Sequence, residues 1–244
     1  MLLHSFLLAL VVFIAAITQS TSGFGFGIVF MAVIPLFWPY KECTVLSMIT
    51  CLFLQIITII RLHKHIKWRM VIFPAIGAFI GTFIGVHLMI NINPRLMNLI
   101  LGLFLWALAI YMIFISKRVH LKQGVPTELS MGFIGGFMSG MFAVGGPPMV
   151  AYYDSVIDEP LTYQATIQTY FMLTTLSNIF NNFLCGNVTA KLITPLCITL
   201  ISCLLGTLVG IKILHKVSMQ VIRKLAYTVM ICAGTYDLIK AIFL

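Results

Sequence analysis

Charged residues are scarce in this sequence. Only 9% of its 244 residues are Asp, Glu, Lys or Arg, and six residues are acidic, whereas soluble domains carry about 25% charged residues. So few charges cannot hydrate the surface of a soluble domain, which excludes that class. The scarcity of acids also leaves no paired carboxylates, and no nucleophile stands beside a histidine and an acid. The sequence therefore does not favour an enzyme.

Cysteine motifs and metal-ligand clusters are absent as well. The six cysteines lie in apolar segments without CxxC spacing, so we expect them to act as packing residues. His63 and His65 have a spacing that a metal could use, but no further ligand stands near them in the sequence. The sequence thus predicts no cofactor and no metal site.

Apolar residues make up 61% of the chain. They form segments close to the length of about 20 residues that a helix needs to cross a bilayer. The segments lie at about residues 43–60, 70–90, 96–115, 164–184, 193–214 and 219–242. We therefore predict an all-α polytopic membrane protein in contact with the lipid bilayer. The net charge of +9 comes mainly from loops, which indicates membrane topology and not binding to nucleic acid.

Two parts of the chain resemble each other. GTFIG at 81–85 recurs as GTLVG at 206–210, an offset of 125, and further upstream an offset of 121 pairs Gly25 with Gly146. A repeated order of segments accompanies these matches. We predict two repeats, each a Gly/Pro-broken helix hairpin followed by three transmembrane helices.

The boundary between the repeats is expected near residue 120. The first repeat then comprises residues 1–120, with its hairpin at about 2–37. The second comprises residues 121–244, with its hairpin at about 129–157. Basic residues indicate their orientation: if the second repeat is inverted, eleven Lys and Arg residues fall on the cytoplasmic side and four on the other. Because cytoplasmic loops collect basic residues, this favours inverted-topology repeats.

Small residues recur at every fourth position in one apolar segment of each repeat. Such faces let two helix backbones approach closely in lipid. We therefore expect tight helix packing there, and not substrate binding. The residues are Gly77, Gly81 and Gly85, and then Ser202, Gly206 and Gly210.

Glycines interrupt an apolar segment in each repeat, as GFGFG at 23–27 and AVGGPP at 143–148. A helix that breaks there exposes backbone N–H groups at its new N-terminus, and these can bind an anion inside a cavity. The second segment is too short for two crossings, so we expect a re-entrant hairpin. The first is either a similar hairpin or two crossings. The alternative for both is a kink that only lets helices cross.

Candidate substrate-binding residues follow from these breaks. Glycines in the second break allow a ligand to approach closely, and prolines suit the first turn of a helix. Polar side chains before the first break and within the apolar segments either complete the cavity or form interhelical hydrogen bonds. The candidates are Gln19, Ser20, Thr21, Ser22, Gln55, Gly145, Gly146, Pro147, Pro148, Gln168 and Asn178.

The motifs SGFGFGIVFMAVIP (22–35) and GGFMSGMFAVGGPPMVAYY (135–153), each followed by a GTxxG helix, resemble the TauE/SafE family of sulfite exporters. The resemblance covers nearly the whole chain. It implies a secondary transporter of small sulfur-containing anions, sulfite or an organosulfonate such as sulfoacetate, in the bacterial inner membrane. It also implies that Gly23, Gly25 and Gly27 face a central site together with the second motif.

We expect transport by alternating access around the paired hairpins, in the direction of export. An anion channel, or an importer of a related small oxyanion, is the alternative. The sequence leaves the oligomeric state open, a homodimer included.

Overall fold

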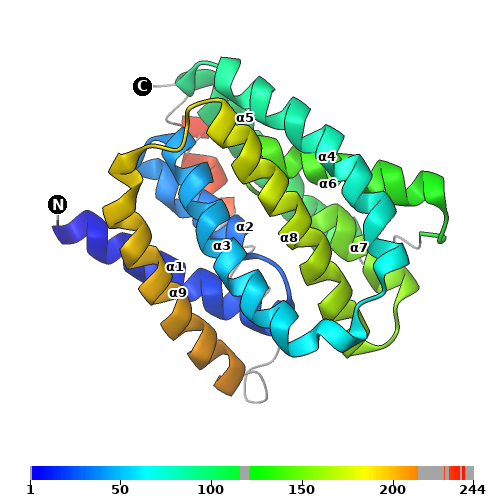
Figure 1. Cartoon of the computed structure of the whole chain (residues 1–244). Helices are drawn as coiled ribbons and strands as arrows, with labels where there is room; N and C mark the ends of the chain where they lie inside the picture. The colour runs from blue at the N-terminus through cyan, green and yellow to red at the C-terminus, as the bar shows by residue number, and fades with distance from the viewer. Residues whose placement is uncertain (1, 116–120, 214–227, 229–230, 237, 240–244) are drawn as a thin grey trace.

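The structure is a computed structural model that describes residues 2–115, 121–213, 228, 231–236 and 238–239 (Figure 1). Every regular element in these ranges is a helix, as the sequence predicts. The helix predicted at about 219–242 lies largely outside the described residues. The same holds for the stretch 116–120.

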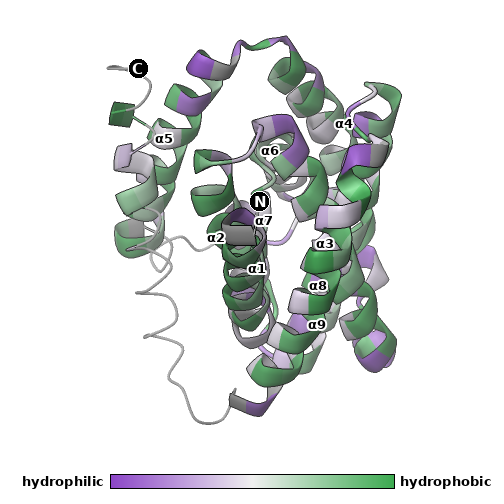
Figure 2. Ribbon diagram, turned by 90° about the vertical axis from the view of Figure 1, so that its left-hand side faces the viewer, coloured by the Kyte–Doolittle hydropathy of each residue, from purple (hydrophilic) through white to green (hydrophobic). Residues whose placement is uncertain are grey.

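Long helices dominate the fold. They are α1 (Leu2–Ser22), α3 (Tyr40–Leu62), α4 (Trp68–Asn91), α5 (Pro94–Ile110), α8 (Pro160–Leu184) and α9 (Ile193–Ile213). In the described part of the chain, all of these except α8 are long and apolar enough to cross a membrane. Large apolar side chains such as Phe79 and Ile80 of α4 are about half exposed, and Figure 2 shows apolar residues along the long helices. The chain is a multi-pass membrane protein.

Both glycine segments form broken helices with unequal arms. In the first, α1 ends at Ser22 and the short helices α2 (Phe26–Val33) and η1 (Ile34–Leu36) follow; in the second, α6 (Val125–Phe142) precedes α7 (Gly146–Val156). The second hairpin was expected at about 129–157, but α6 begins at Val125. The reason is Pro126, which suits the first turn of a helix and so belongs to α6. In the first segment only α1 is long enough to span a membrane.

Helix starts in the two predicted repeats differ by nearly constant offsets. The pairs begin as follows: α2 and α7 at Phe26 and Gly146, α3 and α8 at Tyr40 and Pro160, and α4 and α9 at Trp68 and Ile193. The first two pairs give an offset of 120 and the third gives 125. At the breaks, the offset of 120 between helix starts is one residue less than the offset of 121 that the matching glycines give. By helix start, Gly25 and Gly145 take the same place, directly before α2 and α7.

The small residues of α4 and α9 lie where helices touch, as predicted. A methyl group added to Gly81 would overlap the backbone of Phe133 in α6, and one added to Gly206 would lie 2.5 Å from the carbonyl oxygen of Phe13 in α1. α6 presents glycines of its own to this contact. The facing residues are Gly77, Gly81 and Gly85 on α4 with Gly132, Gly136 and Gly140 on α6.

Helices α3 and α8 occupy the centre of the molecule. Figure 1 shows them between the α1–α9 pair and the α4–α6 pair, and contacts join α3 to α9 and α4 to α8. Hydroxyl groups make these contacts, with Thr50 of α3 bonded to Thr199 of α9 at 2.8 Å and Thr82 of α4 to Ser177 of α8 at 2.6 Å. These two hydroxyl pairs thus link α3 to α9 and α4 to α8.

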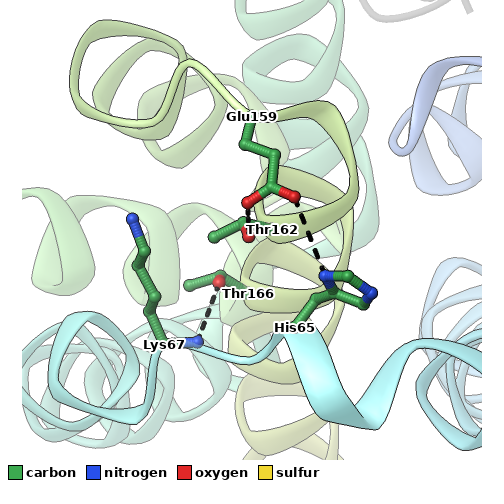
Figure 3. Close-up of polar contacts among 5 residues, drawn as sticks. All are labelled: His65, Lys67, Glu159, Thr162 and Thr166. Carbon is green, nitrogen blue, oxygen red and sulfur yellow. Dashed lines mark hydrogen bonds and ion pairs between the residues drawn. The ribbon is translucent and has the colours of Figure 1, made fainter.

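A short loop ties α3 and α4 to the start of α8 (Figure 3). The helical turn η2 (His63–His65) follows α3, and His65 Nδ1 lies 3.8 Å from Glu159 Oε1. The backbone N–H of Lys67 donates to Thr166 Oγ1 at 3.2 Å, while Thr162 donates to the other oxygen of Glu159. Both side chains of the His65–Glu159 pair are exposed, so it contributes little to stability.

Candidate functional site

The two breaks meet inside the protein. A methyl group added to Gly27, at the start of α2, would overlap the carbonyl oxygen of Ala143 in the second break. A methyl group at Gly146 would lie 3.7 Å from the Cβ atom of Phe24 in the first break. Chain segments about 120 residues apart therefore bring their interrupted backbones into direct contact.

Left-handed backbone conformations end the first arm of each broken helix. Gly23 has φ 78° and Gly25 has φ 108°, values that side chains other than glycine rarely tolerate. Ala143, which follows the last residue of α6 as Gly23 follows the last residue of α1, has φ 57°. Since alanine in this region costs about 1–2 kcal/mol, the surrounding packing must hold the second break in place.

Two glutamines hold the first break. Gln19 Oε1 accepts a hydrogen bond of 3.0 Å from the backbone N–H of Phe26, the first residue of α2. Gln168, which comes from α8, donates to the carbonyl oxygen of Gly23 at 2.7 Å. The two amides also approach each other at 3.5 Å. The break is therefore positioned by side chains from both halves of the chain.

A cavity of about 50 Å³ lies between the breaks, enclosed also by α3 and α8. It is large enough for a few water molecules or one small oxyanion, since one water needs about 10–15 Å³. Its walls combine exposed backbone with hydroxyl, amide and apolar side chains. None of the residues that line it is Lys, Arg, His, Asp or Glu.

Backbone amides without an acceptor among the described residues belong to lining residues of both breaks, and in the second break these are Val144, Gly145 and Gly146. In the first break, the N–H of Phe26 donates to Gln19. The next two N–H groups of α2, on Gly27 and Ile28, have no acceptor among the described residues. Both residues line the cavity. At the start of α7, Pro147 and Pro148 have no N–H to offer. The two helix starts are thus unequal as anion sites, because the second has lost two donors.

Two buried amides near the cavity are incompletely hydrogen-bonded. Gln55, 2% exposed, donates from Nε2 to Cys51 Sγ and to Thr175 Oγ1, both at 3.3 Å, while its Oε1 has no partner. Asn178 donates to Ser139 Oγ at 2.9 Å, and its Oδ1 also lacks a partner. Gln55 lines the cavity, whereas Asn178 supports it through Ser139.

The structure brings together part of the predicted site. The cavity is lined by Gln19, Gly25, Gly27, Gln55, Gly145 and Gly146. Gly23 and Gln168 lie behind this lining and bond to each other. Pro147 and Pro148 instead line a separate, almost wholly apolar cavity of about 440 Å³ beside α5.

Ser20 and Thr21, which precede the first break, do not line the cavity, and the predicted role of the Ser22 side chain lies outside what the structure describes. The hydroxyl of Ser20 donates to the carbonyl oxygen of Ala16, and that of Thr21 to the carbonyl oxygen of Ile17. Both donors are therefore used within α1, and Ser20 also packs close to Gly210 of α9. Ser22 is the last residue of α1.

Several lining residues were missed by the sequence analysis. They include Ser47, Cys51, Ser139, Phe171, Thr174 and Thr175. Helical spacing would have found some of them: Ser47 and Cys51 stand eight and four residues before Gln55, on one face of α3. On α8, Phe171, Thr174 and Thr175 follow the same rule.

One buried carboxyl group was not among the predicted site residues. Glu128, in the first turn of α6, is 3% exposed and accepts a hydrogen bond of 2.8 Å from the Tyr152 hydroxyl. It has no ion-pair partner among the residues that the structure describes, and it does not line the cavity. Within the same part of the chain, no cluster of three His, Cys, Asp or Glu residues could hold a metal ion.

Comparison with known proteins agrees with the geometry of a membrane protein. The profile of the family described as sulfite exporter TauE/SafE matches residues 8–236. A probable sulfite/organosulfonate exporter TauE of Cupriavidus necator is 26% identical over 92% of this chain and 90% of its own length. A probable membrane transporter protein of Methanocaldococcus jannaschii is 27% identical over 96% and 95%. No solved structure matches. The chain therefore belongs to the TauE/SafE family, whose members are membrane transporters and not enzymes.

Proposed function

We propose that the chain is a secondary transporter that exports a small sulfur-containing anion, sulfite or an organosulfonate such as sulfoacetate, across the bacterial inner membrane. The observation that carries this proposal is the small polar cavity where the two broken helices meet. The family and the name of the Cupriavidus necator relative support the choice of anion.

The proposed mechanism is alternating access between two inverted repeats. Its support comes from α3 and α8, which correspond to each other at an offset of 120 and touch through Gln55 and Thr175, residues at that same offset. Gln55 of α3 bonds to Thr175 of α8, and Lys67, which follows α3 and η2, bonds to Thr166 of α8. The residue numbers rise on the first side as they fall on the second. Helices α3 and α8 therefore run antiparallel. Corresponding helices that meet in opposite directions are what inverted repeats require.

The contacts between repeats suggest how the two sides move. α4 of the first repeat packs on α6 of the second, and α9 of the second packs on α1 of the first. Each pair joins a glycine-rich helix rigidly to a broken helix. Rocking of the two pairs about the α3–α8 contact would open the cavity to one side of the membrane and then to the other.

The uncharged lining suits a transporter because weak binding permits release. Backbone amides and hydroxyl groups can stabilise an oxyanion, while no Lys or Arg side chain in the lining would hold it tightly. The cavity volume suits sulfite. Sulfoacetate is larger and carries a second acidic group, so it needs a wider cavity than this conformation offers.

Flux into proteoliposomes tests the proposal. Vesicles containing the full chain and loaded with unlabelled sulfite should take up labelled sulfite by counterflow, with saturation, and the same vesicles should be assayed with sulfoacetate. Empty vesicles are the control. Flux that never saturates and shows no counterflow would indicate a channel, and lack of movement of any small anion would refute the proposal.

A further inference from the structure

The cavity contains a buried acceptor that lacks a donor. Gln55 Oε1 has no hydrogen-bond partner, although the side chain is 2% exposed and lines the cavity. The amide nitrogen of the same side chain is engaged by Cys51 Sγ and Thr175 Oγ1. A buried acceptor left without a donor is unfavourable, so the position calls for a bound group that donates a hydrogen bond.

The uncharged lining also limits the charge of the bound species. Desolvation of an ion becomes more unfavourable with the square of its charge, so a dianion is opposed about four times as strongly as a monoanion of equal size. No cationic side chain lines the cavity to offset this penalty. The amides of Gly27 and Ile28 offer partial positive charge, which matches a single negative charge better than two.

We propose that the cavity binds the singly protonated, singly charged form of its oxyanion. The acid O–H donates to Gln55 Oε1, and the ionised oxygens accept from the backbone amides of the first break. For sulfite this form is hydrogensulfite. The inference rests on the proposed transport function and makes Gln55 a specificity-determining residue. A proton then crosses the membrane with each anion, and no carboxyl group of the protein has to carry it.

The titratable groups near Gln55 are two cysteines. Cys51 lies one turn before it on α3, and Cys203 of α9 approaches the same turn, with its sulfur 3.9 Å from the carbonyl oxygen of Thr50. The lining residues from α1, α2, α6, α7 and α8 and from the two breaks include no titratable side chain. A Cys51→Ser variant therefore separates titration of the substrate from titration of the site.

The decisive experiment measures counterflow of labelled sulfite in proteoliposomes at equal pH on both sides, over a pH range that spans the second dissociation of sulfite. Above that pKa, the half-saturating concentration of total sulfite should rise about tenfold per pH unit, because only hydrogensulfite binds. The maximal rate should stay level. Cys51 contacts Gln55, so Cys51→Ser is free to change the half-saturating concentration itself, but its rise of about tenfold per pH unit should persist.

The outcomes distinguish this inference from the proposed function. A half-saturating concentration that is constant, or that falls as pH rises, would overturn the inference while transport itself persists. Absence of saturable exchange at every pH would contradict the proposed function and the inference together.

A pair of matched variants tests the role of Gln55. Gln55→Met removes the acceptor but keeps the length of the side chain, and it should raise the half-saturating concentration of hydrogensulfite about tenfold. Gln123→Met makes the same change at an exposed position and should behave as the wild type. An unchanged half-saturating concentration in folded Gln55→Met protein would refute the acceptor role; if that variant does not fold, the wild-type pH profile still tests the proposal.

Discussion

Single residues near the breaks have roles that their identity alone does not specify. Gln19 was expected to donate to a ligand, yet its oxygen accepts from the Phe26 amide and completes the start of α2. Gln168 bonds the carbonyl oxygen of Gly23 and does not reach the cavity. The sequence shows that these amides lie in apolar segments and need partners. It does not show which partner each one finds, because that depends on how the two halves meet.

Gly146 provides a direct test of the cavity at the residue scale. A methyl group there would make ordinary contacts of 3.7 Å with Phe24 and Phe171, and the backbone needs no left-handed conformation. Gly146→Ala should therefore fold normally but reduce sulfite counterflow at least about tenfold by filling the cavity. Gly124→Ala, where a methyl group would meet only Pro126 at 3.9 Å, is the control. Equal transport by both variants would show that Gly146 does not line the transport site.

Gln168 tests whether the first break is held from α8. Gln168→Met removes the donor to the Gly23 carbonyl oxygen, which leaves that buried acceptor with a bond of 3.4 Å from Gln19. We expect a loss of about 1–3 kcal/mol of stability, measured as a lower unfolding temperature in detergent. Gln123→Met is the matched surface control. If both variants unfold at the wild-type temperature, the break is held by other contacts.

The sequence predicts the apolar membrane-spanning helices and their packing faces. It predicts the two helix breaks only in part. Runs of apolar residues locate α3, α4, α5 and α9, and the four-residue spacing of small residues identifies the contact faces of α4 and α9. The break of the second helix was located by AVGGPP, whereas its start at Val125 precedes the predicted start at about residue 129. The left-handed conformation of Ala143 carries no sequence signal, because alanine usually prefers a helix.

The contact between α4 and α6 can be tested by enlarging one glycine. Gly81→Val would force side-chain atoms into the backbone of Phe133 and Phe137. We expect a loss of at least about 2 kcal/mol of stability and a fall in the yield of folded protein. Ile80→Val changes a neighbouring residue that is 52% exposed, and it should have little effect. Folded Gly81→Val protein with wild-type stability would contradict the close contact.

At the scale of the whole molecule, the two halves meet at α3 and α8 and border the cavity between the breaks. The two repeats could be proposed from sequence because GTFIG and GTLVG mark corresponding helices. Their cross-packing, α4 on α6 and α9 on α1, could not, since nothing in the pattern of apolar residues specifies the partner of a helix. The cavity arises from this exchange, because each half supplies one of the broken helices that form it.

Labelling from each side of the membrane tests the inverted topology. The distribution of basic residues predicts that single cysteines at His65 and Lys122 react from the cytoplasmic side, and that cysteines at Asn93 and Asn187 react from the other. The contact between His65 and Glu159 fits this arrangement, since it joins two loops at one face. Parallel repeats would instead place Asn187 on the same side as His65.

The central claim is that the anion binds where the two broken helices meet. A structure determined by electron cryomicroscopy with sulfite present tests it most directly. We predict density for one oxyanion between the first break and Gly146, within hydrogen-bonding distance of Gln55 and the Gly27 amide. Density at another position, with this cavity left without an anion at saturating sulfite, would contradict the account.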